Sequence, residues 1–105
     1  MVAVVNGVGL RPLPTESFAL ESGLRVRLIP LPHLQSATAS FYVRVGSRYE
    51  RADTNGLSHF LEHMLYRGTE GHPGAHQLNL AIERLGGTLD AATHVDFTSY
   101  ELTLP

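Results

Sequence analysis

Two histidines and a glutamate in one short stretch are the strongest candidates for chemistry in this chain. His59, Glu62 and His63 lie within the segment GLSHFLEHMLYRG. Residues four apart are neighbours on an α-helix, so both imidazoles can direct a nitrogen onto one zinc ion. A nearby carboxylate can then accept a proton from water that the metal has acidified. The pattern predicts a hydrolytic zinc (Zn²⁺) site with two histidine ligands and a glutamate base.

A helix that carries no metal is the competing interpretation, because two histidines four apart also occur by chance on amphipathic helices. The glutamate before the second histidine favours the metal site. The order His-x-x-Glu-His on a helix is a known arrangement of catalytic zinc sites. We therefore expect His59 and His63 to be ligands and Glu62 to be the general base.

The helix that must position these residues is predicted from the apolar pattern around them. Asp53, Thr54 or Asn55 can cap its N-terminus, and Gly68 ends it. A helical wheel places the three motif residues on one side. The opposite side is apolar and is made by Leu57, Leu61, Met64 and Leu65. We expect the apolar side to dock on the fold and the motif residues to point away from it.

Strands are predicted before and after this helix. Residues 16–32 indicate two short strands joined at Ser22-Gly23, and ATASFYVRVG indicates a third. We expect the second and third strands to be half buried. A second helix over residues 75–85 precedes TLDAAT and FTSYELTLP, which are close enough to form an antiparallel pair. The order predicts an α+β fold, a mainly antiparallel sheet with two helices packed on one face.

Composition limits the kinds of partner. The chain has 105 residues, 43% of them hydrophobic, which suits one globular unit. Its formal net charge is -2, and its arginines are scattered, so we expect no nucleic acid and no membrane as a partner. Without cysteine, histidine and carboxylates are the strong metal ligands that remain. The first residues lack the basic region of a signal peptide, which favours a cytoplasmic location.

Several segments together resemble one family, the M16 zinc metallopeptidases. They are GLRVRLIPLP, FYVRVGSRYE, GLSHFLEHMLYRGTE and LNLAIERLGGTLDAATHVDFTSYEL, in that order. The family includes pitrilysin, insulin-degrading enzyme and the mitochondrial processing peptidases. The resemblance implies that residues 1–105 are the N-terminal portion of a single M16-type domain, with a lead segment over 1–15 and a folded core over 16–105.

The resemblance also implies roles for individual residues. His59 and His63 become zinc ligands, and Glu62 becomes the general base that activates water. Asp90 and Ala91 match the family's Asn-Ala pair, on a strand whose exposed edge pairs with an extended peptide substrate. Aspartate replaces the asparagine in this chain and cannot donate an amide hydrogen, although strand addition needs no particular side chain.

The third zinc ligand that the family uses is a glutamate on a later helix, which this chain does not include. The resemblance further implies that the remaining M16 domains, or a second M16-like subunit, enclose the substrate. We therefore expect a zinc-dependent endopeptidase segment that is not competent alone. Two alternatives remain open, a non-catalytic M16-like partner or scaffold subunit and an unrelated α+β interaction domain.

Overall fold

The structure is a computed structural model and describes residues 12–105. The chain divides into two compact units, with the boundary between Leu34 and Gln35, and each unit is described by itself. The expectation about a signal peptide, and most of the expected lead segment, concern residues outside the described range. Within that range, no helix has the length and apolar character needed to cross a membrane.

The first unit contains a short β-hairpin. Strands β1 (Glu16–Ala19) and β2 (Arg25–Leu28) pair in antiparallel fashion. Gly23 adopts a φ of 84°, a left-handed conformation that glycine reaches without strain, and its amide donates to the Leu20 carbonyl. The predicted turn at Ser22-Gly23 is confirmed.

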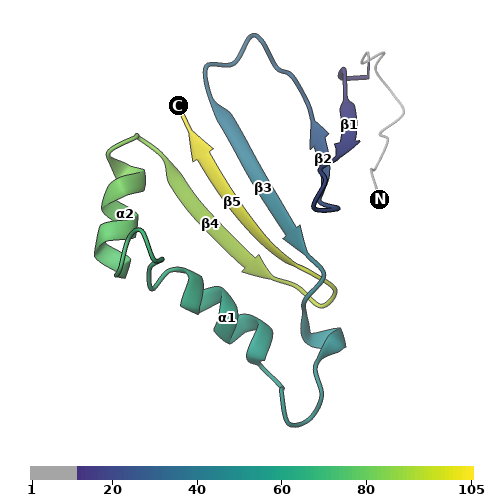
Figure 1. The fold of residues 1–105 in the computed structure, drawn as a ribbon, viewed down its shortest axis with the longest axis vertical. Coiled ribbons are helices and arrows are strands. Elements are labelled where there is room, and N and C mark those ends of the chain that lie inside the picture. The colour runs from purple at the N-terminus through teal and green to yellow at the C-terminus, as the bar shows by residue number, and fades with distance from the viewer. Residues whose placement is uncertain (1–11) are drawn as a thin grey trace, which may run out of the picture. The chain divides into compact units, whose positions relative to one another are not determined.

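The second unit is built on a three-stranded antiparallel sheet (Figure 1). Its strands are β3 (Ala37–Val43), β4 (Thr88–Thr93) and β5 (Thr98–Leu104), in the order β3-β5-β4. A short 3-10 helix, η1 (Ser47–Tyr49), follows β3. The predicted β4–β5 hairpin is confirmed, and β3 pairs with the far side of β5.

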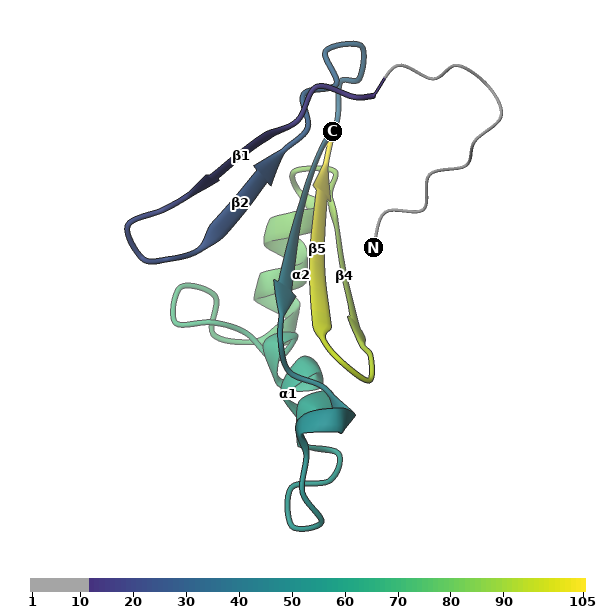
Figure 2. The same cartoon turned by 90° about the vertical axis from the view of Figure 1, so that its right-hand side faces the viewer.

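Two helices lie between β3 and β4 in the sequence. They are α1 (Leu57–Leu65) and α2 (Ala75–Glu83), and both contact β4 (Figure 2). The chain leaves α2 through Gly86, whose φ of 71° is typical of a helix end. Antiparallel strands with two helices confirm the predicted α+β class.

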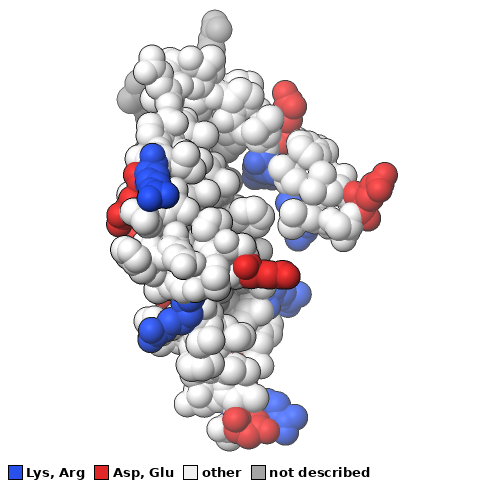
Figure 3. Space-filling model, turned by 60° about the vertical axis from the view of Figure 1, so that its left-hand side comes forward, with Lys and Arg blue, Asp and Glu red and all other residues white. Residues whose placement is uncertain are grey.

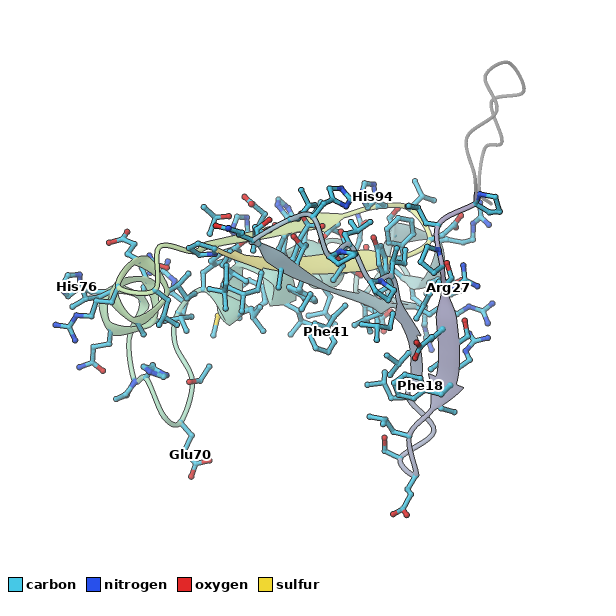
Figure 4. The ribbon with its side chains drawn as sticks, turned by 90° about the horizontal axis from the view of Figure 1, so that it is seen from above. Phe18, Arg27, Phe41, Glu70, His76 and His94 are labelled. Atoms are coloured by element: carbon cyan, nitrogen blue, oxygen red, sulfur yellow. The ribbon has the colours of Figure 1, made fainter. Side chains whose placement is uncertain are left out.

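The prediction that the second and third strands are half buried is wrong. Every residue of β3 is exposed, and so is most of β2. The helices contact β4, which is separated from β3 by the central strand, so β3 gains little cover from them. Figure 4 shows Phe41 of β3 projecting freely from one face of the sheet.

The described residues contain no buried apolar side chain. Large apolar side chains remain exposed instead on β3 and along α1. Charged side chains of both signs are interspersed on the face shown in Figure 3, in keeping with the small net charge. The described part of the chain therefore has a sheet and helices but lacks the apolar core that normally stabilises such elements.

Candidate metal and catalytic site

The helix that carries the motif docks on the sheet through polar residues. Ser58 and Glu62 are the buried residues of α1, with exposed fractions of 4% and 9%. On the apolar side, Leu57 and Leu61 are 45% and 49% exposed. The prediction that the apolar side docks and all three motif residues point away is therefore wrong.

A hydrogen-bond partner on β4 explains why a carboxylate is buried beneath α1. The Thr93 hydroxyl donates to Glu62 Oε2 over 2.5 Å. Burying a charged group is costly unless it is hydrogen-bonded, and a hydroxyl donor offsets part of that cost. The helical wheel alone could not reveal this partner, because it lies 31 residues further along the chain.

The two motif histidines face each other on the exposed flank of the same helix. Their Nε2 atoms are 3.0 Å apart and their ring centroids 4.5 Å apart. Two nitrogens bound to one tetrahedral zinc ion lie about 3.3 Å apart, given zinc–nitrogen distances of about 2.0–2.1 Å. The pair therefore fits a zinc ion as two of its ligands with little adjustment.

No group of three metal-binding side chains occurs within residues 12–105. His76, the histidine of α2, points outward from that helix (Figure 4). A zinc site normally has at least three protein ligands. Within the described residues, His59 and His63 are thus a pair of candidate ligands rather than a complete zinc site.

An open hollow of about 730 Å³ adjoins the motif. Its walls come from η1, the loop before α1, α1 itself, the end of β4 and the following turn. The lining residues are Ser47, Glu50, Asn55, Gly56, His59, Glu62, Ala92, Thr93, His94 and Val95. One histidine of the pair and the glutamate therefore open onto the same space.

Glu50 caps α1, a role that its place in the sequence does not predict. Its two carboxylate oxygens accept the amides of Gly56 and Ser58, over 2.7 and 2.8 Å. The predicted cap within residues 53–55 is wrong, because the N-cap is Gly56, which has no side chain to accept a bond. Hydrogen bonds from the Ser58 side chain and from these two amides lower the pKa of Glu50 below its ordinary value.

The sequence points only weakly to Glu50 as a cap, because a carboxylate that caps a helix from the preceding loop has no fixed spacing from the helix start. Its acidic side chain shortly before the predicted helix is the feature that could have suggested a cap. The helix N-terminus carries a partial positive charge, and a carboxylate placed there is favourable.

The two residues expected to bind substrate lie on β4, at one edge of the described sheet. Asp90 is exposed and Ala91 is partly buried on the opposite face. Asp90 is the register partner of Glu101 on β5. The Glu101 carboxylate accepts a hydrogen bond from the Ser40 hydroxyl on β3 over 2.9 Å. Within residues 12–105, β4 has a strand partner on one side, β5, and its other edge is unpaired.

Tyr66, at the end of α1, lies near the negatively charged side chains of Asp90 and Glu62. Burial raises the pKa of Tyr66, and the negative charges of Asp90 and Glu62 raise it further. A tyrosine is already protonated at neutral pH, so the raised pKa leaves Tyr66 a hydrogen-bond donor there.

The turn between β4 and β5 closes one wall of the hollow. The amide of Arg48 donates to the Val95 carbonyl over 3.0 Å, and its guanidinium pairs with Asp96 at 2.8 Å. Gly46 lies so close to this turn that an added Cβ would be 2.5 Å from the Val95 carbonyl oxygen. A glycine is therefore required for close approach, although its backbone is extended.

Comparisons with known proteins agree on one family. Residues 25–105 match the sequence pattern of the family described as insulinase (peptidase family M16). The chain is 43% identical, over 86 residues, to the mitochondrial-processing peptidase subunit beta of Lentinula edodes. That match covers 82% of this chain and 18% of the relative.

Two further proteins extend the comparison to bacteria. An uncharacterized zinc protease of Bacillus subtilis, YmxG, is 34% identical over 79% of this chain and 20% of its own length. The crystal structure of a protease from Helicobacter pylori superimposes with a TM-score of 0.81 at 29% identity. It covers 88% of this chain and 22% of that protein.

The chain spans about a fifth of the length of these two curated relatives, the fungal subunit and the Bacillus protease. The family match nevertheless covers residues 25–105, which hold the motif helix and all three strands of the second unit. The predicted resemblance is confirmed: the chain belongs to the insulinase family of peptidases, family M16.

Proposed function

We propose that this chain is a segment of a zinc-dependent endopeptidase that hydrolyses peptide bonds in extended peptides or unfolded proteins. One observation carries the proposal. The facing Nε2 atoms of His59 and His63 lie on the helix whose Glu62 carboxylate opens onto the same hollow as His59. Relatives named as zinc proteases support the same assignment.

His59 and His63 are the residues of this chain that would hold the metal. A bound zinc ion supplies Lewis-acid activation of water and of a carbonyl oxygen. To act as ligands, the two Nε2 atoms would both have to be free of hydrogen, and each neutral ring would then carry its proton on Nδ1.

Glu62 is the proposed general base. It accepts one proton from a water molecule, and the resulting hydroxide oxygen bonds to the scissile carbonyl carbon. The bond from that carbon to nitrogen then breaks, and the departing amine takes the proton from Glu62. The second proton of the water molecule passes from the new carboxyl group to the amine, so the products are a carboxylate and an ammonium group, and the glutamate returns to its starting form.

Substrate recognition is proposed for the free edge of β4. An extended peptide can add to an unpaired strand edge through main-chain hydrogen bonds, whatever its sequence. Asp90 and Ala91 occupy this edge strand, one on each face. Asp90 offers an acceptor rather than a donor, which favours substrate groups that donate hydrogen bonds.

The site needs a further zinc ligand from outside residues 1–105. We propose that this chain forms part of one M16-type domain, and that the remaining M16 domains or a second M16-like subunit complete the site. A non-catalytic partner or scaffold subunit that keeps the M16 fold without the chemistry remains the alternative.

The test compares three variants in the full-length protein, with zinc content and cleavage of an unfolded protein as readouts. Glu62→Gln should lower cleavage by about 100- to 10,000-fold and leave zinc bound, because it removes the base but neither ligand. His63→Ala should lose most of the zinc. His76→Ala is the matched control, since this histidine points outward from α2.

The outcomes separate the two functions. Cleavage that survives in Glu62→Gln would remove this residue from its role. Zinc bound equally by His63→Ala and the wild type would remove the metal assignment. A wild-type protein that binds zinc but cleaves nothing would favour the scaffold.

A further inference from the structure

We propose that Thr93 is a positioning residue for catalysis, because it fixes the carboxylate of Glu62 in the orientation needed to take a proton from water. The inference rests on the proposed function and extends it to a residue on the sheet. It assigns Thr93 no contact with the reacting atoms.

The contact joins the two elements that form the site. Thr93 is the last residue of β4, and its hydroxyl donates to one oxygen of Glu62, Oε2. The carboxylate has two oxygens, so a bond to one leaves the other available to accept a proton. Within the described part of the chain, no second hydrogen bond holds this carboxylate.

The donor is held in place by the sheet rather than by a loop. Thr93 pairs directly with Thr98 at the start of β5, and Thr98 is only 2% exposed. The Thr98 hydroxyl in turn donates to the Val45 carbonyl over 2.9 Å. The backbone of Thr93 is therefore placed by pairing with a strand partner that is itself buried and hydrogen-bonded, and its hydroxyl is oriented by the bond to Glu62.

Such an arrangement limits rotation of the glutamate side chain. A glutamate has three side-chain torsions, and a free carboxylate would sample several orientations at the edge of an open hollow. A charge-assisted hydrogen bond to a fixed donor selects one of them. Catalytic groups held by supporting hydrogen bonds react faster than groups that must first be ordered.

A purely structural role is the alternative. Thr93 would then only satisfy a buried carboxylate and help α1 dock on β4. In that case its loss would lower the amount of folded protein or its zinc content without slowing the enzyme that remains folded. A positioning role predicts instead a lower kcat per zinc-loaded molecule, with little change in KM.

The experiment uses the full-length protein, with kcat and KM per bound zinc for cleavage of an unfolded protein. Thr93→Val keeps the shape and removes the donor, whereas Thr93→Ser keeps the donor. We expect kcat to fall about 10- to 100-fold in Thr93→Val and to stay within about 3-fold of wild type in Thr93→Ser. Thr38→Val is the matched control, since it removes a hydroxyl from an exposed position on β3.

Two results would overturn the proposal. One is a kcat for Thr93→Val close to that of wild type, and the other is a kcat for Thr93→Ser as low as that for Thr93→Val. If Thr93→Val does not fold, Thr93→Ala against Thr93→Ser makes the same comparison. Glu62→Gln is measured alongside, because cleavage that survives in that variant would remove Glu62 from its proposed role. Loss of cleavage in Glu62→Gln together with a wild-type kcat in Thr93→Val would remove only the role of Thr93.

Discussion

At the residue scale, the start of α1 depends on a carboxylate in the loop that precedes the helix. Glu50 accepts two amides that the helix itself leaves without partners. His59 lies next to the second of these amides, on Ser58. Glu50 therefore stabilises the first turn of α1, which carries His59, the first of the two proposed zinc ligands.

Replacing Glu50 by glutamine should destabilise the protein in a pH-dependent way. The native pKa of Glu50 lies below its ordinary value of 4.5, so its contribution is fully present above that pH. The contribution is lost as the pH falls through the lowered native pKa. In the full-length protein, urea-unfolding midpoints should therefore differ between wild type and Glu50→Gln at pH 7, and the difference should shrink in acid.

Glu70→Gln is the matched control for this prediction, because Glu70 is an exposed glutamate at the tip of a loop (Figure 4). Its unfolding midpoint should follow that of wild type at each pH. Hydrogen exchange of residues 56–60 gives a local readout, with faster exchange expected in Glu50→Gln. Identical curves for Glu50→Gln and wild type would show that the cap contributes nothing.

Some candidate site residues can be identified in the sequence and others cannot, for a clear physical reason. His59, Glu62 and His63 are related to one another by helical spacing, which can be read directly from the chain. Thr93 and Glu50 act across loops, so no periodicity points to them. Their contributions depend on how α1 meets β4, which is a property of the tertiary structure.

At the element scale, the strands and helices were predictable but the docking of α1 was not. Hydrophobic alternation located β2 and β3, and the turn at Ser22-Gly23 located the first hairpin. The wheel correctly separated polar and apolar sides of α1. It assumed that the apolar side faces the sheet, whereas Glu62 and Ser58 are buried because polar partners on β4 and in the preceding loop satisfy them.

The junction of η1 with the β4–β5 turn provides a test at this scale. Gly46→Ala would place a methyl carbon 2.5 Å from a backbone oxygen of Val95. The turn must then move, at a cost of about 1–3 kcal/mol. The amide of Arg48, which donates to that oxygen, should exchange faster with solvent.

Gly71→Ala is the matched control for Gly46→Ala. An added Cβ at this position meets nothing within 4 Å, and its backbone is not in the left-handed region. Its stability should stay within about 0.5 kcal/mol of wild type. Equal exchange at Arg48 in both variants would show that the turn tolerates the added carbon.

At the scale of the whole molecule, the described residues lack an apolar interior. Side chains such as Phe41 of β3 and Phe60 of α1 are 55% and 58% exposed. Burial of apolar surface is the main favourable contribution to folding, and the entropy of the chain opposes it. This fold therefore needs apolar surface from outside residues 12–105 to reach ordinary stability.

The isolated 105-residue chain should accordingly show no cooperative unfolding transition. Its exposed apolar side chains should bind a hydrophobic dye strongly at neutral pH. The same measurements on the full-length protein should give a cooperative transition and weak dye binding. A sharp transition in the isolated chain would contradict the need for outside surface.

The pairing of β3 with β5 also sets an order of events during synthesis. Ala37 pairs with Leu104, so β3 leaves the ribosome long before its partner strand exists. At about 5–20 residues per second, β3 waits roughly 3–12 s with both edges open. Over this interval the backbone groups of β3 have no partner from β5, and an open strand edge of this kind can pair with another chain.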